Sequence, residues 1–409
     1  MKKITCKITA LCLLVVLLFT ACADDIGTNI TTIGDITTAS PTTTTTKLPL
    51  SSALTTTETP TTNIPDPTTP KVEPTYITLL AVGDNLMHLP VVQSGQKVGY
   101  DSFYKELEPM IKSADVAIIN QETIFTDKTP SGYPAFGTPK EIGEAALAAG
   151  FDVFSTATNH TADKGEDAIL YTLDFWDNHP EGLMLGLNRE KADRTRIPSL
   201  TVKGVKIGFL NYTYGMNASL KKWWMVDILD KSDDGKALIA SRIEKAKEEC
   251  DFVVMCAHWG SEYVNTPTAS EQTWAQFFAD CGVDLVIGTH PHVVQPVMEL
   301  EGKDGNKTLV YYSLGNFVHN QNDFAPNIGG LATIKLVCDE DGVRIDEYNL
   351  VGTMVDCYKN EDGVRCYSAC LISEMTDERL KKHIKFSKKT VADFEKEFEK
   401  ASTAYPKGN

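Results

Sequence analysis

Histidine, carboxylate and amide side chains follow short apolar runs at five places along this 409-residue chain. Five of its eight histidines lie in or beside these places. Neutral imidazole and carboxylate or amide oxygen are ligands for borderline divalent cations such as Zn, Mn and Fe, and open α/β sheets place their sites at the carboxyl ends of strands. The pattern predicts a site for two divalent metal ions. The polar segments are Gly83-Asp84-Asn85 with His88 close behind, Asn120-Gln121-Glu122, Asn159-His160, His258-Trp259-Gly260 and Gly288-Thr289-His290-Pro291-His292.

Each of these residues also has a simpler structural explanation. Asp84 and Asn159 could cap the helices that follow them, and Glu122 could be a surface residue. The two histidines that flank Pro291 would point to the same face if their segment is extended. Three imidazoles, two carboxylates and an amide from separate strand ends together favour metal binding. The predicted ligands are Asp84, Glu122, Asn159, His258, His290 and His292.

Two cations in one site support hydrolysis. Held roughly 3.5 to 4 Å apart, they can direct in-line attack of water on phosphorus and neutralise the charge of the transferred group. The same ligands also support attack on an amide carbonyl. The residues alone therefore leave phosphoester and amide chemistry open.

Apolar runs rich in β-branched residues predict buried strands, and helix-like stretches separate most of them. The alternation predicts βα layers around a mostly parallel or mixed sheet. Strands are predicted over residues 77–82, 116–119, 153–155, 207–210, 252–255 and 285–287, and helices over 103–111, 140–149, 167–176, 237–249 and 271–280. After residue 292, strand-like runs at 293–299, 308–313, 330–337 and 343–350 predict a second, antiparallel sheet packed on the first.

The C-terminal region adds a charged, helix-like segment from about residue 377 to 400. Its Phe386, Val391, Phe394 and Phe398 form a narrow apolar stripe, which predicts a packing face. Upstream, Cys357 and Cys366 flank the turn sequence Asn360-Glu361-Asp362-Gly363. A disulfide across this hairpin is one possibility outside the cell, and free thiols are the other.

The N-terminal region indicates export. Lys2, Lys3 and Lys7 precede an apolar run over residues 8–19, which is too short for a membrane span and is typical of a secretory signal. Thr20-Ala21-Cys22 resembles a bacterial lipobox, which predicts lipidation of Cys22. The alternatives are ordinary cleavage near Ala21 or Ala23, or an uncleaved anchor.

Residues 23–74 are dominated by Thr, Pro and Ser, a composition that predicts a disordered stalk. The full chain has a formal net charge of −16, and it shows no basic patch. We therefore expect no nucleic-acid partner.

Several motifs in order resemble the CapA family, the poly-γ-glutamate capsule biosynthesis proteins. The resemblance covers about residues 76–320. Its motifs are Gly-Asp at 83–84, Asn-x-Glu at 120–122, Asn-His at 159–160, His-Trp-Gly-x-Glu at 258–262, Gly-Thr-His-Pro-His-Val-Val-Gln at 288–295 and Ser-Leu-Gly-Asn-Phe at 313–317.

The resemblance implies a calcineurin-like metallophosphatase fold, an α/β (α+β) four-layer αββα sandwich in which helices flank two mixed sheets. It implies that Glu122 bridges two cations (Mn, Fe or Zn) and that His160 is a general acid. Glu262 is predicted to assist catalysis, and His88, Asn85 and Asn316 to support the site. The superfamily's opening motif is Asp-x-His, but Leu86 stands at the histidine position here, so one cation lacks a ligand unless His88 or water replaces it.

The predicted organisation is a lipoprotein signal peptide over residues 1–22, the stalk over 23–74, a CapA-like domain over 75–355 and a C-terminal extension over 356–409. The favoured function is that of a lipid-anchored metallohydrolase on the outer face of the bacterial cytoplasmic membrane. It would act on a phosphoester linked to an anionic envelope or capsule polymer, beside other capsule-biosynthesis proteins. The alternatives are a polymer-binding export scaffold, or metal-assisted amide hydrolysis or transfer on poly-γ-glutamate.

Overall fold

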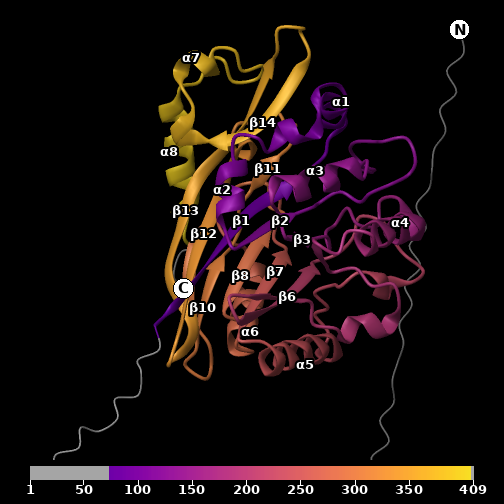
Figure 1. Ribbon diagram of the computed structural model, residues 1–409, viewed down its shortest axis with the longest axis vertical. Helices are drawn as coiled ribbons and strands as arrows, with labels where there is room; N and C mark the ends of the chain where they lie inside the picture. Colours follow the sequence, from indigo (N-terminus) through magenta and orange to yellow (C-terminus); the bar gives the residue numbers. More distant parts are fainter. Residues whose placement is uncertain (1–72, 407–409) are drawn as a thin grey trace, which may run out of the picture. The chain divides into compact units, whose positions relative to one another are not determined.

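Two mixed β-sheets lie face to face between layers of helices (Figure 1). The computed structural model describes residues 73–406, which belong to one compact unit. The predicted signal peptide, Cys22 and nearly all of the predicted stalk lie outside the described residues.

The first sheet has eight strands in the order β14-β13-β12-β1-β2-β3-β4, with β11 paired to β1. Strands β1 to β4 run parallel, whereas β12, β13 and β14 are antiparallel. Its strands are β1 (Thr75–Asn85), β2 (Val116–Asn120), β3 (Val153–Ser155), β4 (Leu183–Leu185), β11 (Asn316–Val318), β12 (Ile328–Asp339), β13 (Gly342–Lys359) and β14 (Arg365–Leu371).

The second sheet has six strands in the order β5-β6-β7-β8-β10-β9. Its four central strands are parallel, and antiparallel strands form both edges. Its strands are β5 (Ser199–Val202), β6 (Val205–Thr213), β7 (Phe252–His258), β8 (Leu285–Thr289), β9 (Val297–Glu301) and β10 (Lys307–Tyr311).

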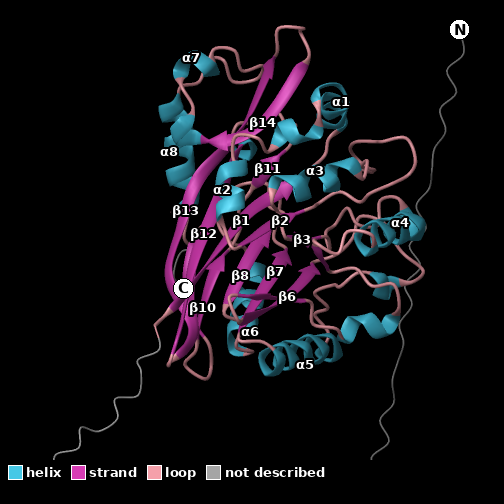
Figure 2. Cartoon of the chain, viewed as in Figure 1, coloured by secondary structure: helices cyan, strands magenta, loops and turns pink. Residues whose placement is uncertain are grey.

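Three apolar clusters separate the layers. One packs α1 to α4 on the outer face of the first sheet, another fills the space between the sheets, and a third packs α5 and α6 on the second sheet. Figure 2 shows these helices in cyan and the strands in magenta. The main helices are α1 (Leu89–Val98), α2 (Glu108–Ser113), α3 (Glu141–Ala149), α4 (Gly165–Asp177), α5 (Asp233–Glu249) and α6 (Ala269–Asp280), and short 3-10 helices cover Tyr100–Phe103, Lys191–Thr195, Trp223–Met225, Ala325–Asn327 and Ile372–Glu374. The predicted four-layer αββα architecture is confirmed.

Alternation along β1 shows how the sequence specifies these layers. Leu80 and Val82 belong to the helix-covered cluster, whereas Leu79 and Ala81 belong to the cluster between the sheets. Successive side chains of a strand point to opposite faces. A continuous apolar run is therefore what a strand buried on both faces requires.

Four parallel strands begin in the same way. The residue just before β2, β3, β7 and β8 is an aspartate whose carboxylate accepts the N–H of the neighbouring strand. These bonds join Asp115 to Thr78 (2.9 Å), Asp152 to Ala117 (2.8 Å), Asp251 to Lys206 (2.7 Å) and Asp284 to Val253 (2.8 Å). The repeated bond helps to fix the register of each strand and hence the level at which its carboxyl end stops.

The predicted second, antiparallel sheet is wrong. Strands β9 and β10 join the second sheet, where β10 pairs with β8 in parallel, but β12 and β13 join the first sheet beside β1. The chain crosses between the sheets near Leu314, whose N–H donates to Gly288 and whose carbonyl accepts from Gly330. Local patterns identified the strands, but pairing depends on such non-local contacts.

Most predicted helices are present, with two differences. The predicted helix over 103–111 is a 3-10 turn that ends at Phe103 followed by α2, and α1, which carries Pro90 in its first turn, was not anticipated. The C-terminal segment forms α7 (Asp377–Leu380) and α8 (Val391–Ser402). Its apolar stripe packs into a cluster with β12 and β13, so the predicted packing face is confirmed.

The expected boundary after residue 355 falls within β13, and β14 continues the same sheet. The hairpin between these strands turns at Asn360–Gly363 as the sequence indicates, but the disulfide across it is wrong, because Cys357 and Cys366 are free. Cys357 lies opposite Tyr367, and Cys366 lies opposite Tyr358. The two thiols therefore stand on opposite faces of the hairpin.

Among residues 73–406, no helix combines the length and apolar character that a bilayer span requires.

Candidate metal centre

Strand ends from both sheets meet at one place in the core. Asp84 lies near the end of β1, Glu122 follows β2, Asn159 follows β3, His258 is the last residue of β7, and His290 follows β8. Parallel strands end at the same edge of a sheet, so side chains distant in the sequence become neighbours there. The structure brings all six predicted ligands, including His292, to this place.

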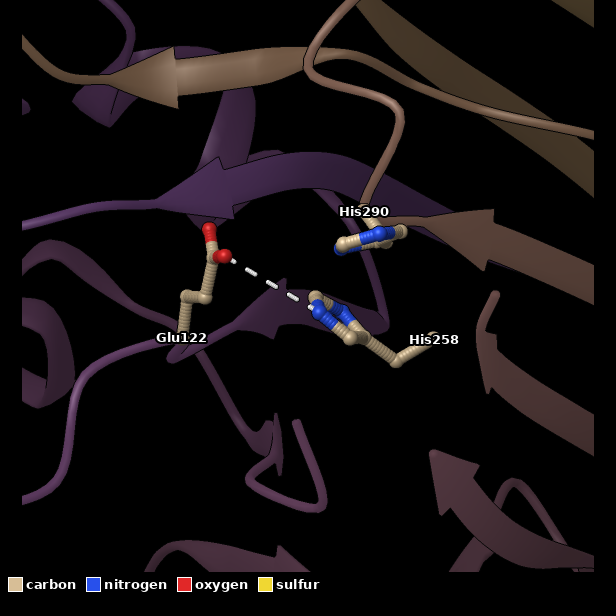
Figure 3. Close-up of side chains that lie close together, drawn as sticks. All are labelled: Glu122, His258 and His290. Atoms are coloured by element: carbon tan, nitrogen blue, oxygen red, sulfur yellow. Dashed lines mark ion pairs between the residues drawn. The ribbon is translucent and has the colours of Figure 1, made fainter. Parts of the chain in front are cut away.

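Two groups of side chains have metal-ligand geometry. One group is Glu122, His258 and His290, and the other is Asp84, Glu122 and His292; in each, the potential ligand atoms lie within 4.8 Å of one another. Glu122 belongs to both groups. Figure 3 shows its carboxylate facing the imidazoles of His258 and His290, with Oε1 3.9 Å from His258 Nε2.

Glu122 is the residue whose surroundings most strongly favour a bound cation. It is buried, and neither carboxylate oxygen has a hydrogen-bond partner among the described residues. Burial, together with the nearby Asp84 carboxylate, holds the pKa of Glu122 well above its usual range. An ionised buried carboxylate without partners is costly, and coordination of a metal ion offsets that cost. The Nδ1 atom of His290 is likewise buried and unpartnered, so the donor set fits divalent cations.

His258 is held from both sides. Its Nδ1 lies 3.0 Å from the Thr289 hydroxyl, and its Nε2 lies 2.9 Å from Asn159 Oδ1. Burial holds the pKa of His258 well below its usual range. The imidazole is therefore neutral, as a metal ligand must be.

His292 is paired with carboxylates. Its Nδ1 lies 3.0 Å from Asp84 Oδ2 and its Nε2 lies 3.8 Å from Glu122 Oε1. Burial lowers the pKa of His292, but Glu122 and Asp84 raise it more, to about 9. The proton on His292 therefore partly compensates the two acids when no cation is bound. Asn316 donates to the His292 carbonyl at 3.2 Å and so helps to hold this loop.

The segment that carries His290 and His292 is not extended, contrary to expectation. Strand β8 ends at Thr289, and the two histidines have φ angles of 98° and 58°. Non-glycine residues rarely adopt such angles, and they cluster at functional sites. The turn around Pro291 places the two ring centroids 5.9 Å apart.

His160 belongs to a separate buried pair. Its Nδ1 lies 2.7 Å from Asp163 Oδ2, and its ring packs edge-on against Phe136 with centroids 4.6 Å apart. The same Asp163 oxygen accepts the N–H of Phe136 at 2.8 Å. Because Nδ1 is engaged, Nε2 is the nitrogen left for proton transfer.

The remaining predicted site residues are Glu262, His88 and Asn85. Glu262 is exposed, although its charge raises the pKa of Glu122. His88 Nδ1 accepts the Asn320 N–H at 3.2 Å, and burial lowers the pKa of His88 to about 4. Asn85 donates to Tyr104 and Gln121. His88 is in neither ligand group, and buried Leu86 supplies no donor.

Several residues at the site were not assigned from the sequence. Asn120 donates to Asp84 Oδ1 at 2.8 Å and accepts from Ser155 at 3.0 Å, so it positions a ligand. Tyr214 and Tyr263 lie against His290 and His292, with ring centroids 4.6 and 5.9 Å apart. Asn120 is the first residue of the Asn-x-Glu motif and Tyr263 directly follows the His-Trp-Gly-x-Glu motif, and these positions could have indicated both residues.

The sequence matches the family described as "Bacterial capsule synthesis protein PGA_cap" over residues 78–321. The PGA biosynthesis protein CapA of Bacillus subtilis (strain 168) is 30% identical over 264 residues, which are 62% of this chain and 67% of that protein. The capsule biosynthesis protein CapA of Bacillus anthracis is 28% identical over 260 residues, 60% of each chain. The chain thus spans about three fifths to two thirds of the length of these relatives.

Solved phosphoesterases are similar in structure at lower levels of identity. A phosphatase from Mycoplasma pneumoniae has a TM-score of 0.43 at 14% identity and covers 68% of this chain and 93% of its own. The calcineurin-like phosphoesterase YfkN of Bacillus subtilis has a TM-score of 0.37 at 14% identity and covers 80% and 99%. The family match extends past both ends of the metal centre, from before Asp84 to after His292, and this chain belongs to the PGA_cap family of bacterial capsule synthesis proteins.

Proposed function

We propose that this protein is a metal-dependent hydrolase of phosphoester type that acts on an anionic capsule or envelope polymer, or on its phosphoester precursor. The observation that carries the proposal is the buried Glu122 carboxylate, which has no hydrogen-bond partner among residues 73–406 and is shared by two groups of potential ligands. This carboxylate suits the binding of two cations, because imidazoles and a second carboxylate complete the set of donor atoms around it.

In this proposal Asp84, Glu122, His258, His290 and His292 hold the cations, and Asn159 contributes its amide oxygen. The cations would supply a polarised acceptor group and a nucleophilic water. Asn120 and Thr289 orient Asp84 and His258, and Asn316 holds the loop that carries His292.

His160 would act as the general acid. Asp163 engages its Nδ1, which fixes the ring and leaves the Nε2 proton to pass to the leaving oxygen. Phe136 covers one side of the imidazole and restricts its orientation. Glu262, exposed at the rim, would assist by electrostatic influence on the centre.

Metal content and turnover of two variants test the proposal. His292→Ala should lose bound metal and activity, because it removes a predicted ligand. His292 is buried and paired with Asp84, so circular dichroism must show that the variant stays folded. His160→Ala should keep its metal but lose roughly 10²- to 10⁴-fold in turnover, the usual contribution of a general acid. The measurements are metal stoichiometry and hydrolysis of phosphomonoesters, phosphodiesters and γ-linked amides.

Comparing hydrolysis of γ-linked amides with hydrolysis of phosphoesters distinguishes amide from phosphoester chemistry. The scaffold alternative is supported by Leu86, which leaves the Asp84 group without the imidazole that the superfamily's opening motif supplies. A His292→Ala protein that still supports capsule formation in cells would favour the scaffold over the enzyme.

We also propose that Cys22 carries a lipid that anchors the protein to the outer face of the cytoplasmic membrane. Support comes from the sequence alone, in the apolar run followed by Thr20-Ala21-Cys22. Cys22→Ala should release the protein into the medium or leave it unprocessed. Membrane retention with normal N-terminal processing after this change would contradict the anchor.

A further inference from the structure

A cavity of about 250 Å³ lies beside the metal centre. Tyr214, Lys231, Trp259, Ser261, Ser270 and Trp274 are among the residues that line it. Sites for whole drug-sized ligands usually measure roughly 300 to 1,000 Å³. This cavity therefore suits one substituent of a substrate better than a complete molecule.

The cavity shares part of its wall with the metal centre. The Tyr214 ring lies 4.6 Å from the ring of His290, and the Tyr214 N–H donates to the His258 carbonyl at 2.8 Å. Trp259 directly follows His258, and its N–H donates to the Thr289 carbonyl at 3.0 Å. A substrate held at the metal centre thus has the cavity immediately next to it.

The lining of the cavity favours an anion. Among residues 73–406, Lys231 is the only charged residue that lines it, and Ser261 and Ser270 contribute hydroxyl groups. No carboxylate from the described part of the chain lines the cavity, although the protein as a whole is strongly acidic. Tyr214 adds a phenol to the lining.

Lys231 is free to bind a ligand, because it forms no ion pair with any residue from 73 to 406. Its nearest acid in the sequence, Asp230, accepts the Ser232 N–H at 2.9 Å at the start of α5. The indole rings of Trp259 and Trp274 are buried and supply an apolar wall. The cavity therefore combines one cation and hydroxyl donors with a surface for methylene groups.

We propose that this cavity, here called the Lys231 subsite, binds a carboxylate-bearing aliphatic group of the substrate next to the reacting group. The inference rests on the proposed function, because it assumes that the metal centre binds the scissile group. It adds that the substrate carries a carboxylate close to that group. Lys231 would pair with the carboxylate, the hydroxyl groups would donate to it, and the tryptophans would cover the methylene groups.

The test compares two non-hydrolysable phosphonates that differ only at the end of one aliphatic arm, which bears either a carboxylate or a carboxamide. Their affinities for the Mn²⁺-loaded protein would be measured by calorimetry. We expect the unmodified protein to prefer the carboxylate about tenfold, and Lys231→Ala to lose this preference without weakening binding of the carboxamide. Lys231→Arg should keep most of the preference, and Lys303→Ala, which removes an exposed lysine outside the cavity, should keep all of it.

The same arms attached to a hydrolysable phosphoester give a second measurement. Lys231→Ala should raise KM about tenfold for the carboxylate substrate alone and leave kcat unchanged. Equal binding of both phosphonates, or a preference that survives in Lys231→Ala, would overturn the subsite. A protein that binds both phosphonates with the expected preference but hydrolyses no ester would instead contradict the proposed function and leave the subsite standing.

Discussion

At the scale of single residues, hydrogen bonds hold several predicted ligands of the metal centre in place, but the Glu122 carboxylate has none from the described residues. His258 is held at both ring nitrogens, and Asp84 accepts from Asn120 and from the His290 backbone. Within the described part of the chain, in contrast, neither oxygen of Glu122 has a hydrogen-bond donor. Buried polar groups in folded proteins are nearly always paired, so a buried carboxylate with both oxygens unpaired supports the proposed binding of cations at Glu122.

Asn120 offers a test of positioning. Its amide donates to Asp84 at 2.8 Å and is itself held by Ser155. Asn120→Ala should leave Asp84 free to reorient and weaken metal binding roughly 10- to 100-fold, the usual effect of removing a residue that orients a ligand. Competition with a metal-binding dye would measure the change. Ser155→Ala, which removes a bond one step farther from the ligand, should weaken binding less, and equal losses in the two variants would contradict this order.

Asp284 offers a pH-dependent test outside the site. Burial raises its pKa to about 6, from a usual value near 3.8. Between these values the native state binds more protons than the unfolded state, so the free energy of unfolding falls as pH rises from about 4 to 6. Asp284→Asn keeps an oxygen for the Val253 N–H but cannot ionise. Relative to the unmodified protein, its stability should therefore increase from pH 4 to pH 7, as denaturant titrations at both pH values would show. A difference that is independent of pH would contradict the raised pKa.

At the scale of elements, the closest approach near the site is between β1 and the crossing segment before β11. A Cβ atom at Gly83 would lie 1.9 Å from the Gly315 carbonyl oxygen, which also accepts the N–H of Asp84 at 2.9 Å. This contact is between backbones, so side-chain movement cannot relieve it. The glycine therefore allows β1 to bring Asp84 close to Asn316, its partner across the two strands.

Gly83→Ala should separate β1 from this segment. We expect a loss of roughly 2 to 4 kcal/mol in the free energy of unfolding, at or above the usual range for an overpacked core, together with loss of metal. Gly215→Ala is a matched control, because a Cβ atom there meets nothing within 4 Å and φ is not positive. Denaturant titration and metal analysis of both variants would check this, and equal stabilities would contradict the proposed close contact.

The strands that could be predicted from the sequence are those whose apolar runs are buried on both faces, such as β2 and β7. Their local composition carries the signal. The placement of β12 beside β1 could not be predicted, because antiparallel pairing with a strand about 250 residues earlier leaves no local pattern. Helix α1 could not be predicted, because Pro90 stands at its start and Gly95 within its ten residues, and both residue types usually indicate turns.

The six predicted ligands could be placed together because they follow strands whose carboxyl ends meet. Their roles as ligands remain predictions. The details of the segment from His290 to His292 could not be foreseen, because positive φ angles depend on the surrounding loops. Asn120 was missed because an asparagine inside a strand end is equally consistent with a structural hydrogen bond.

At the scale of the whole molecule, the C-terminal residues belong to the same folded unit as the metal centre. Arg379 bonds Asp356 on β13 at 2.6 Å and Glu106 on the segment between the first 3-10 helix and α2 at 2.7 Å. Lys385 donates to the carbonyls of Asn320 and Gln321 at 2.8 and 2.6 Å. Gln321 in turn accepts from Asn316, which holds the His292 carbonyl. The C-terminal region is thereby connected to the loop that carries a predicted ligand.

A chain that starts at residue 73 and ends after Val355 should therefore fail to fold. It would cut β13 four residues before Lys359, remove β14 from the edge of the first sheet, and expose the apolar cluster that α8 and Phe386 cover. Asp356 and its partner Arg379 would be lost together. Glu106 would lose Arg379, but its side chain is partly exposed to solvent, so the defect would come mainly from lost packing and strand pairing. A chain that ends after Tyr405 keeps α8 and serves as the control, which should unfold in one cooperative transition. Circular dichroism melts and gel filtration would compare the two chains. A cooperative, monomeric chain ending at Val355 would show instead that residues 356–409 are a separate extension, as the sequence alone suggested.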